Sequence, residues 1–535
     1  MKILLIVPKY NFSNKINYEY AFPIGLAYIA AVVKKYYGSN LKSLNLNHLD
    51  GKTEYLVHNK LNEEKYDVIL TGHLGIGYAA IEKIVKAVKK HKTKPKIIIG
   101  GSLVTSEPEL MLTSLKPDYI VIGEGEETII ELLKTIEKNE DPLKVNGIGF
   151  LKDNEPILTK PRELITNIDE IPFPDFEELE YTKFLENLSN SANYHELDYP
   201  RNYCILLSRG CPFQCTFCYH SIGSKYRTRS LDNIFKEIEE AIKKFDINSL
   251  IIYDDMFSVN KKRLFEFCKR IKELSLKYKR KIVWSCQLSV IDVDREMLLT
   301  LKDSGCNIVS FGFESYSPIV LKSMKKPITP EAIANAVKLT REVKIGIQAN
   351  FIFGDTAETK ETAAETLNFW KNYCEGQVQL GFIQPYPGSE IYKRCLEKGI
   401  IKDKLDFIKN NISHTNWFNM TEKMSDKEIL DLKKEILDSR WKYQKYIIPK
   451  KIKKTSEKKY DIEVECPYCK ETIIYKNTFL NSAFHFVMYV SCRNCHMRFY
   501  ISSKVYRFEM KYYQKLDFFR RKYLYIRDNL LKKRI

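Results

Sequence analysis

Three cysteines stand close together near the middle of this 535-residue chain, in the string "CPFQCTFC". They are Cys211, Cys215 and Cys218, and they follow the apolar run "YCILL", which predicts a buried strand. Three thiolates can hold a [4Fe–4S] cluster and leave one iron open to an outside ligand. Zinc with an outside fourth ligand is the alternative, but such a site normally has a second CxxC pair nearby. The spacing therefore favours an iron–sulfur cluster at the end of a strand.

Two further pairs of cysteines lie near the carboxyl end, Cys466 with Cys469 and Cys492 with Cys495. Four thiolates in two CxxC pairs complete a tetrahedral zinc site, so the pairs predict a zinc ribbon. A second iron–sulfur cluster for electron relay is the alternative. A closed four-thiolate shell indicates a structural ion, and we expect the ribbon to dock a partner or a substrate carrier.

The segment around the three clustered cysteines alternates short apolar runs with helical stretches from Tyr203 to about residue 400. Six such units predict a partial TIM-type (β/α)6 barrel, in which the carboxyl ends of the strands carry the chemistry. Acids stand at three of the predicted strand ends: Asp254 and Asp255, then Glu314, then Glu358. One acid is usually a solvated surface group, whereas acids at successive ends of one barrel indicate a binding site.

The first 150 residues contain five apolar runs that alternate with helical stretches. This pattern predicts an α/β, doubly wound, Rossmann-like sheet with a ligand site beyond the carboxyl ends of its strands. Glycine permits a ligand to approach the backbone closely, although simple turn chemistry is the alternative. The glycines at these predicted strand ends include Gly72, Gly100, Gly101 and Gly123.

These patterns divide the chain into six segments. They are the N-terminal domain (1–150), a linker (151–200), the barrel (201–400), a helical and basic linker segment (401–459), the zinc ribbon (460–503) and a basic, aromatic tail (504–535).

The formal net charge of +18 is concentrated near the carboxyl end. The tail mixes Lys and Arg with Tyr, Phe and Leu, a composition that suits a membrane surface. Nucleic acid is the competing partner, and the alternative that needs no partner is an amphipathic helix packed on its own domain. No run of about 18 apolar residues occurs, and the apolar run at the N-terminus is too short for a signal peptide. We therefore expect a cytoplasmic protein, with peripheral membrane contact through the tail as one interpretation.

The string "CPFQCTFC" resembles the cluster motif of the radical S-adenosylmethionine (radical SAM) superfamily. Six more strings resemble the branch of that superfamily with a cobalamin-binding domain: "FPIGLAYIA", "IIIGGSLVTSEPE", "DYIVIGEGEET", "DDMF", "FGFES" and "PYPGS". The resemblance implies that the open iron chelates S-adenosylmethionine, and that the reduced cluster cleaves it to a 5′-deoxyadenosyl radical.

The same resemblance implies roles for residues around the cluster, without assigning catalytic residues. Phe217 and the region of Gly354 and Glu358 would contact adenine, Asp254 and Asp255 the methionine amine, and Glu314 the ribose hydroxyls.

The activity implied is cobalamin-dependent methyl transfer to an unactivated carbon, with methylcobalamin as the methyl carrier. Radical cyclisation, coupling or rearrangement is the alternative, and a nucleic-acid-binding or modifying protein is a second alternative. The expected partners are a small-molecule or lipid substrate and an external electron donor such as flavodoxin or ferredoxin.

One departure concerns the cobalt ligand. Many cobalamin proteins ligate cobalt through the His of a DxHxxG loop after the first strand, and this chain has no such loop there. His48 and Gly51 have the right spacing, but Leu46 replaces the Asp and the string follows the second predicted strand. We expect His48 to be a surface residue and cobalt to lack a histidine ligand from the protein.

Overall fold

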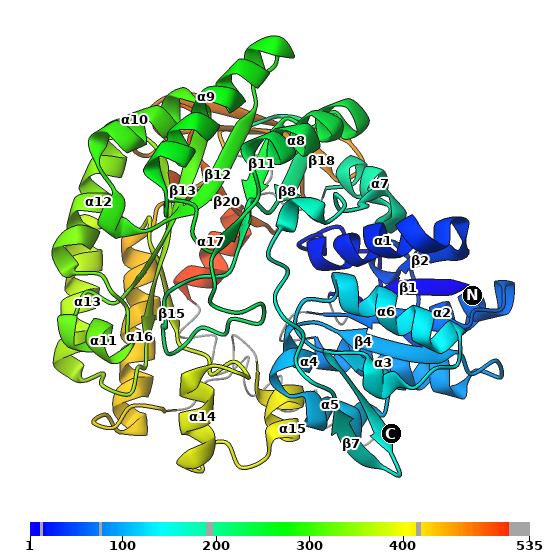
Figure 1. Ribbon diagram of the computed structural model, residues 1–535. Helices are drawn as coiled ribbons and strands as arrows, with labels where there is room; N and C mark the ends of the chain where they lie inside the picture. The colour runs from blue at the N-terminus through cyan, green and yellow to red at the C-terminus, as the bar shows by residue number, and fades with distance from the viewer. Residues whose placement is uncertain (11–13, 74–76, 189–195, 413–418, 513–535) are drawn as a thin grey trace.

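The computed structural model describes residues 1–10, 14–73, 77–188, 196–412 and 419–512. Figure 1 shows the N-terminal domain, in blue and cyan, beside a barrel drawn in green. Among the described residues, no helix has the length and apolar character needed to span a bilayer.

The N-terminal domain is a seven-stranded sheet in the order β2-β1-β3-β4-β5-β6-β7. The first five strands are parallel and the last two are added antiparallel, so the predicted doubly wound sheet is confirmed. The strands are β1 (Ile3–Val7), β2 (Leu41–Asn45), β3 (Val68–Gly72), β4 (Lys96–Gly100), β5 (Tyr119–Val121), β6 (Ile148–Lys152) and β7 (Glu155–Leu158). The helices are α1 (Ile24–Tyr37), α2 (Thr53–Glu63), α3 (Tyr78–Lys90), α4 (Ser102–Ser106), α5 (Pro108–Leu115) and α6 (Glu126–Glu137).

The barrel has six parallel strands in the order β8-β11-β12-β13-β14-β15, which confirms the predicted (β/α)6 architecture. They are β8 (Asn202–Ile205), β11 (Ser249–Ile252), β12 (Val283–Leu288), β13 (Cys306–Glu314), β14 (Gly346–Phe353) and β15 (Gln379–Phe382). Its helices are α8 (Leu231–Phe245), α9 (Lys261–Lys277), α10 (Arg295–Asp303), α11 (Pro318–Ser323), α12 (Pro330–Val343), α13 (Lys360–Tyr373) and α14 (Glu390–Glu397). A short ribbon, β9 (Ser208–Arg209) with β10 (Arg227–Thr228), frames the cysteine loop.

Local sequence explains where the barrel helices begin and end. Ser230 caps α8 by accepting a hydrogen bond from the backbone N–H of Asn233, and Asp246 ends the helix in the left-handed conformation. The apolar face of α8 packs onto the sheet through residues such as Ile234 and Ile238, which are fully buried.

The predicted linker contains ordered structure, including β7 and α7 (Tyr181–Glu186). Phe176 and Tyr181 are buried, their rings contact each other in a tilted arrangement, and both contact Tyr203 of β8. They belong to one apolar core that runs from the N-terminal sheet into the barrel. The two domains therefore share a core, which fixes their relative position.

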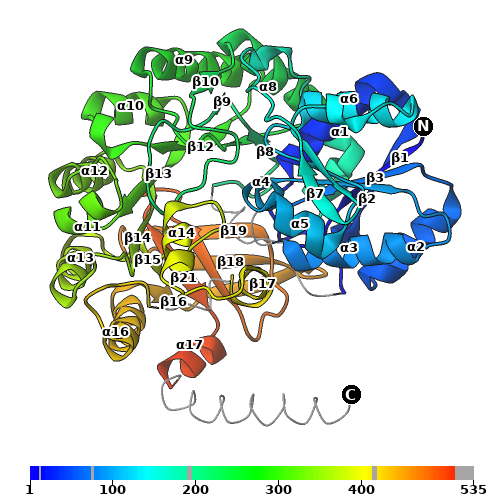
Figure 2. The same cartoon turned by 60° about the horizontal axis from the view of Figure 1, so that its bottom comes forward.

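The carboxyl-terminal part contains α15 (Lys404–Asp406), α16 (Asp426–Tyr443) and two small sheets, packed beside the barrel in Figure 2. One sheet has the order β17-β18-β19 and the other β16-β21-β20. The strands are β16 (Tyr446–Ile447), β17 (Lys451–Ser456), β18 (Lys459–Glu465), β19 (Thr472–Phe479), β20 (Val487–Ser491) and β21 (Arg498–Ser502). The predicted tail begins with α17 (Lys504–Lys511), and residues 513–535 lie outside the described residues.

Candidate functional site

The cysteine loop lies at the carboxyl end of β8, where barrel enzymes carry their chemistry. The backbone N–H of Cys218 donates to the carbonyl of Cys215 at 3.0 Å, which forms a tight turn. Thr216 is tied on both sides, since its N–H donates to Met324 at 3.0 Å and its carbonyl accepts from Ile391 at 2.9 Å. The loop is therefore anchored to segments that follow β13 and β15.

Asp254 fixes the strand that leads into this loop. Its buried carboxylate accepts hydrogen bonds from the Leu207 N–H and the Ser208 hydroxyl, both at 2.6 Å. Burial raises the pKa of Asp254 to about 6, although these two hydrogen bonds oppose the shift. Asp254 is thus engaged within the protein, whereas the neighbouring Asp255 is exposed at the barrel mouth.

Glu314 ends β13 in the left-handed conformation, with a φ of 61°, and is buried. Its Oε1 lies 3.3 Å from Nζ of Lys326. A Cβ on Gly312 would lie 2.4 Å from that carboxylate oxygen and 2.7 Å from the ammonium, so this pair occupies space that only glycine leaves.

No sequence pattern identified Lys326, because two adjacent lysines in the string "MKKP" are typical of a protein surface. Burial disfavours its ammonium, but Glu314 and the Cys215 thiol outweigh that effect and raise the pKa of Lys326. A fixed positive charge beside the cysteines favours an anionic ligand there.

Gly354 and Glu358 lie together after β14. The Glu358 carboxylate is buried and accepts from the Gly354 N–H at 3.0 Å and from the Thr362 hydroxyl at 3.1 Å. The buried Glu358 side chain therefore stabilises the turn after β14, in which Gly354 adopts a φ of 94°.

Phe217 is half-buried and packs against the second apolar core of the protein. The neighbouring Tyr219 lies over Gly388 of the "PYPGS" string, where an added Cβ would be 2.4 Å from the tyrosine ring. Gly388 has a φ of 91°, so both its conformation and this contact require glycine.

A cavity of ≈ 340 Å³ lies between the carboxyl ends of the N-terminal strands and the barrel. This volume is in the range of small-molecule sites. Arg209 and Tyr253 line the cavity from the barrel side. Its wall also includes all four glycines named at the predicted strand ends, Gly72, Gly100, Gly101 and Gly123. The structure thus brings these glycines to one surface that faces the cysteine loop.

The glycines of this wall serve different ends. Gly101 has a φ of 110°, and a Cβ there would lie 2.3 Å from the carbonyl oxygen of His73. A Cβ on Gly72 would lie 2.8 Å from the carbonyl oxygen of Gly100. Gly123 has a φ of 78°, which favours glycine, and a Cβ there would meet no described atom within 4 Å, so the cavity has room beside it.

The chain matches two family models. Residues 205–369 match the radical SAM superfamily, and residues 18–133 match the B12 binding domain. The chain is a radical SAM enzyme with a B12-binding domain. The predicted family is therefore confirmed.

Two curated relatives illustrate the similarity. An uncharacterized methyltransferase, PH0819, from Pyrococcus horikoshii is 28% identical over 409 residues, which cover 75% of this chain and 84% of that protein. Anaerobic magnesium-protoporphyrin IX monomethyl ester cyclase from Cereibacter sphaeroides is 26% identical over 76% of this chain and 66% of its own length.

Two solved structures share the fold. The radical S-adenosylmethionine methyltransferase TsrM from Kitasatospora setae superposes with a TM-score of 0.61 at 16% identity, over 74% of this chain and 76% of its own. The cobalamin-dependent enzyme OxsB gives 0.57 at 20% identity, over 74% of this chain and 55% of its own.

The family implies a [4Fe–4S] cluster, S-adenosylmethionine and cobalamin, and the residues fit all three. Cys211, Cys215 and Cys218 offer three thiolates on one anchored loop, and the half-buried Lys326 supplies a positive charge beside them. The cavity offers a largely apolar wall in which Gly123 leaves room for a ring.

The expectation for His48 is wrong, because this side chain is buried with 1% exposure. Its Nε2 is 2.9 Å from the Tyr20 hydroxyl and its Nδ1 is 3.0 Å from Glu180. Glu180 belongs to the segment predicted as a linker, which folds back over the end of β2 and covers the ring. A different histidine of this chain, His73, lies on the cavity wall, and its ring centroid is 4.7 Å from that of Tyr10.

The four carboxyl-terminal cysteines converge as the spacing predicts. Their sulfur atoms all lie within 4.8 Å of one another. Cys466 is 3.8 Å from Cys495, and Cys469 is 3.6 Å from Cys492. Backbone N–H groups of each knuckle point at a sulfur, as from Tyr468 to Cys466 at 3.4 Å. This arrangement suits one tetrahedral ion such as zinc.

The ribbon packs on the amino ends of the barrel strands, opposite the cysteine loop. The Gln377 side chain accepts from the Arg498 N–H at 2.7 Å and donates to the Tyr468 hydroxyl at 3.0 Å. His496 lies 3.0 Å from the buried carboxylate of Glu196. The ribbon thus uses part of its surface on its own barrel.

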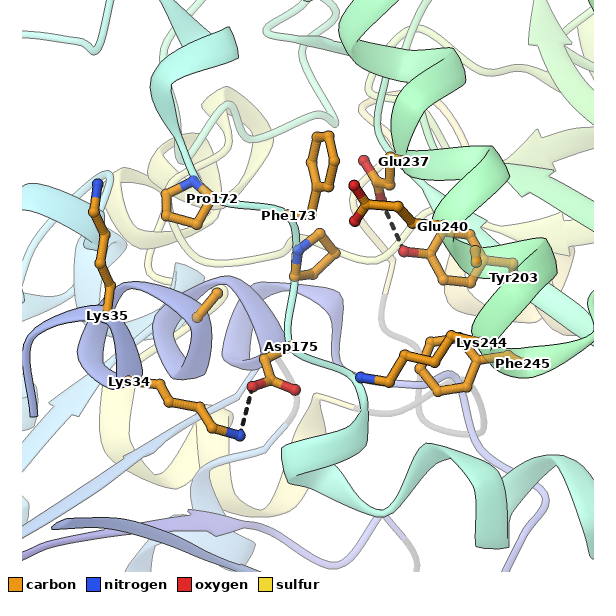
Figure 3. Close-up of a pocket in the computed structure, with 13 residues that line it drawn as sticks. Lys34, Lys35, Pro172, Phe173, Asp175, Tyr203, Glu237, Glu240, Lys244 and Phe245 are labelled. Carbon is orange, nitrogen blue, oxygen red and sulfur yellow. Dashed lines mark hydrogen bonds and ion pairs between the residues drawn. The ribbon is translucent and has the colours of Figure 1, made fainter. Parts of the chain in front are cut away.

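A second hollow, shown in Figure 3, lies between α1 and α8 and measures ≈ 380 Å³. Lys34 pairs with Asp175 at 2.9 Å, and the Tyr203 hydroxyl donates to Glu237 at 2.9 Å. The first pair ties the 172–175 segment to α1 and the second ties β8 to α8, so we interpret the hollow as part of the junction between the two domains.

Proposed function

We propose that this radical SAM enzyme transfers a methyl group from S-adenosylmethionine to an unactivated carbon of a small molecule or lipid, with cobalamin as the carrier. The supporting observation is the cavity, whose wall combines the B12-domain glycines with residues that flank the cysteine loop. Two relatives of the chain are named as methyltransferases of a cytidylyl-phosphonate and of a bacteriochlorophyllide, at 24% and 27% identity.

The bound cofactors would supply a radical that removes hydrogen from carbon and a carrier that delivers methyl. The protein's own residues bind and orient. Lys326, which is half-buried, carries a positive charge that suits the cosubstrate carboxylate, and the exposed Asp255 offers an acceptor for its amine. Glu314, held by Lys326, has a carboxylate suited to ribose hydroxyls.

The adenine contacts are proposed for backbone near Phe217 and Gly354. Glu358 contributes indirectly, because its carboxylate holds the Gly354 N–H. The largely apolar wall of the cavity would offer few partners to water beside the reacting groups. An external flavodoxin or ferredoxin would supply the electrons.

Radical cyclisation without methyl transfer is the second candidate. It is favoured by the cyclase relatives, which align over about three quarters of this chain. The two functions differ in the fate of the cosubstrate. Methyl transfer from the sulfonium leaves S-adenosylhomocysteine, whereas radical cleavage gives 5′-deoxyadenosine and methionine.

The test uses the anaerobically reconstituted full chain with cobalamin, dithionite and methyl-labelled S-adenosylmethionine. We expect S-adenosylhomocysteine that depends on added cobalamin, and close to four cluster iron atoms per chain. Replacing Cys211, Cys215 and Cys218 together by Ala should remove the cluster and 5′-deoxyadenosine formation. Production of 5′-deoxyadenosine without any S-adenosylhomocysteine would favour the cyclase alternative, and unchanged cluster absorbance in the triple variant would refute the assignment.

A further inference from the structure

Four buried charged side chains join the B12-binding domain to the root of the cysteine loop. Glu124 comes from the turn between β5 and α6 and Glu126 is the first residue of α6, whereas Arg209 and Arg227 come from β9 and β10. Arg209 lies 2.7 Å from Glu124 through Nη1 and 2.5 Å from Glu126 through Nη2. Arg227 lies 2.7 Å from the other oxygen of Glu124. None of the four side chains is more than 9% exposed.

Glu124 also ties in the segment between the two domains. Its Oε2 accepts from the backbone N–H of Ile165 at 2.9 Å, and Arg227 donates to the Ile165 carbonyl at 2.5 Å. One carboxylate therefore holds three separate parts of the chain. Burial alone would raise the pKa of Glu124, but Arg227 and Arg209 outweigh burial and lower it, so this carboxylate is charged.

The network touches both cofactor sites. Arg209 precedes Cys211 by two residues, and Glu124 lies between Gly123 and Gly125 on the cavity wall. On its other side the same short strand is fixed by Ser208, whose hydroxyl donates to Asp254 at 2.6 Å. The root of the cysteine loop is thus held from the barrel and from the B12-binding domain at once.

Stability alone does not account for such a network. The desolvation of buried charges largely cancels their attraction, so apolar side chains of similar size would stabilise the same junction equally well. A network of charged hydrogen bonds also fixes the relative orientation of the groups that it joins, because the planar guanidinium of Arg209 binds two carboxylates.

We propose that Arg209, clamped by Glu124 and Glu126, is a positioning residue that sets the separation between the iron–sulfur cluster and the corrin ring. The arginine would act through the loop that carries the cysteines and would need no contact with the reacting atoms. The inference rests on the proposed function only in requiring both cofactors in one chain.

The experiment compares Arg209→Met and Arg209→Lys with a matched control, Arg229→Lys. Arg229 forms an equally buried ion pair with Glu237 at 2.5 Å, but this pair stays within the barrel. In the holoenzyme, the reduced cluster speeds the relaxation of the cobalt(II) electron-spin signal with an inverse sixth-power dependence on distance. Iron and cobalt content, measured first, report on cofactor loading and hence on the proposed function.

We expect Arg209→Met to retain both cofactors but to lose the cluster-induced relaxation severalfold, with Arg209→Lys intermediate and Arg229→Lys like the wild type. Wild-type relaxation in Arg209→Met that contains both cofactors, or an equal loss in Arg229→Lys, would refute the positioning role of Arg209. If Arg209→Met does not load, Arg209→Lys decides by the same criterion.

Amide exchange gives a readout that does not need cobalamin. In the cobalamin-free chain, the lysine variant of Arg209 should exchange faster than the wild type in both 122–126 and 208–210, and the control should not. Faster exchange in only one of these segments would overturn the inference. A wild-type chain that binds no cobalamin would refute the proposed function and leave this measurement valid.

Discussion

Replacing Glu358 by Gln should remove a pH dependence from the stability of the barrel. Burial raises the pKa of this carboxyl from its ordinary value of 4.5 to about 7, and the nearby Asp355 adds to the shift. The folded protein therefore holds a proton on Glu358 over a pH range in which the unfolded chain has released it. This contribution to stability is complete below pH 4.5 and is lost as the pH rises through about 7.

The magnitude follows from the shift. Each pKa unit is worth about 1.4 kcal/mol, so the full change amounts to about 3 kcal/mol between pH 4.5 and pH 8. Glutamine keeps the two hydrogen-bonded positions, at 3.0 Å from the Gly354 N–H and 3.1 Å from the Thr362 hydroxyl, without the charge. Between pH 5.5 and pH 8 the change is about 2 kcal/mol, and the unfolding entropy of a 535-residue chain is about 1.1 kcal/mol/K. The thermal midpoint of Glu358→Gln should thus rise relative to the wild type by about 2 °C between pH 5.5 and pH 8.

The assay is thermal unfolding of the full chain at several pH values, with Glu365→Gln as the control. Glu365 lies on α13, the helix that begins just after Glu358, but is exposed. The control should track the wild type at every pH. A constant difference between Glu358→Gln and the wild type across this range would refute the reasoning that Glu358 carries the buried proton.

Three further outcomes are expected. Zinc should remain bound when the clustered cysteines are replaced and disappear when Cys466 and Cys492 become Ser, with metal analysis as the measurement; iron and sulfide at that site would indicate electron relay instead. Deletion of 505–535 should weaken binding to vesicles that contain anionic lipid, because it removes most of the basic tail, and unchanged binding would exclude membrane contact through it. Cobalamin affinity and the visible spectrum of bound cobalamin should be unchanged in His48→Ala, because both ring nitrogens of His48 already contact protein groups, Tyr20 and Glu180. We expect the same of His73→Ala, and a shift of the corrin bands there would identify His73 as a cobalt ligand.

Sequence reasoning worked where the chemistry lies in short strings. The CxxxCxxC spacing, the paired CxxC knuckles and the alternation of strands and helices each depend on neighbours a few residues apart. They predicted the cysteine loop at the end of β8, the four converging sulfurs and both sheets. The cofactor contacts assigned to Phe217 and the strand-end acids stay predictions.

The failures concern side chains whose environment comes from distant segments. His48 is buried because Glu180 returns to it from 132 residues further along the chain. Lys326 reads as a surface lysine until the fold brings Glu314 and the cysteines around it. No local pattern carries this information, since hydropathy alone assigns charged residues to the surface.

The fold also separates two cysteine clusters that look alike in the sequence. The cysteine loop lies at the carboxyl end of the barrel, facing the cavity of the B12-binding domain, whereas the ribbon packs on the amino ends of β14 and β15 through Gln377 and Arg498. Within the described residues the six-stranded barrel is not closed, because its edge strands β8 and β15 do not pair, and the ribbon contacts the segments that precede both edges, at Glu196 and Gln377. An ion held by the four ribbon cysteines would stiffen the ribbon at this contact without approaching the reacting groups. The ribbon thus covers the amino ends of the barrel, and we expect any partner to bind the surface that this contact leaves free.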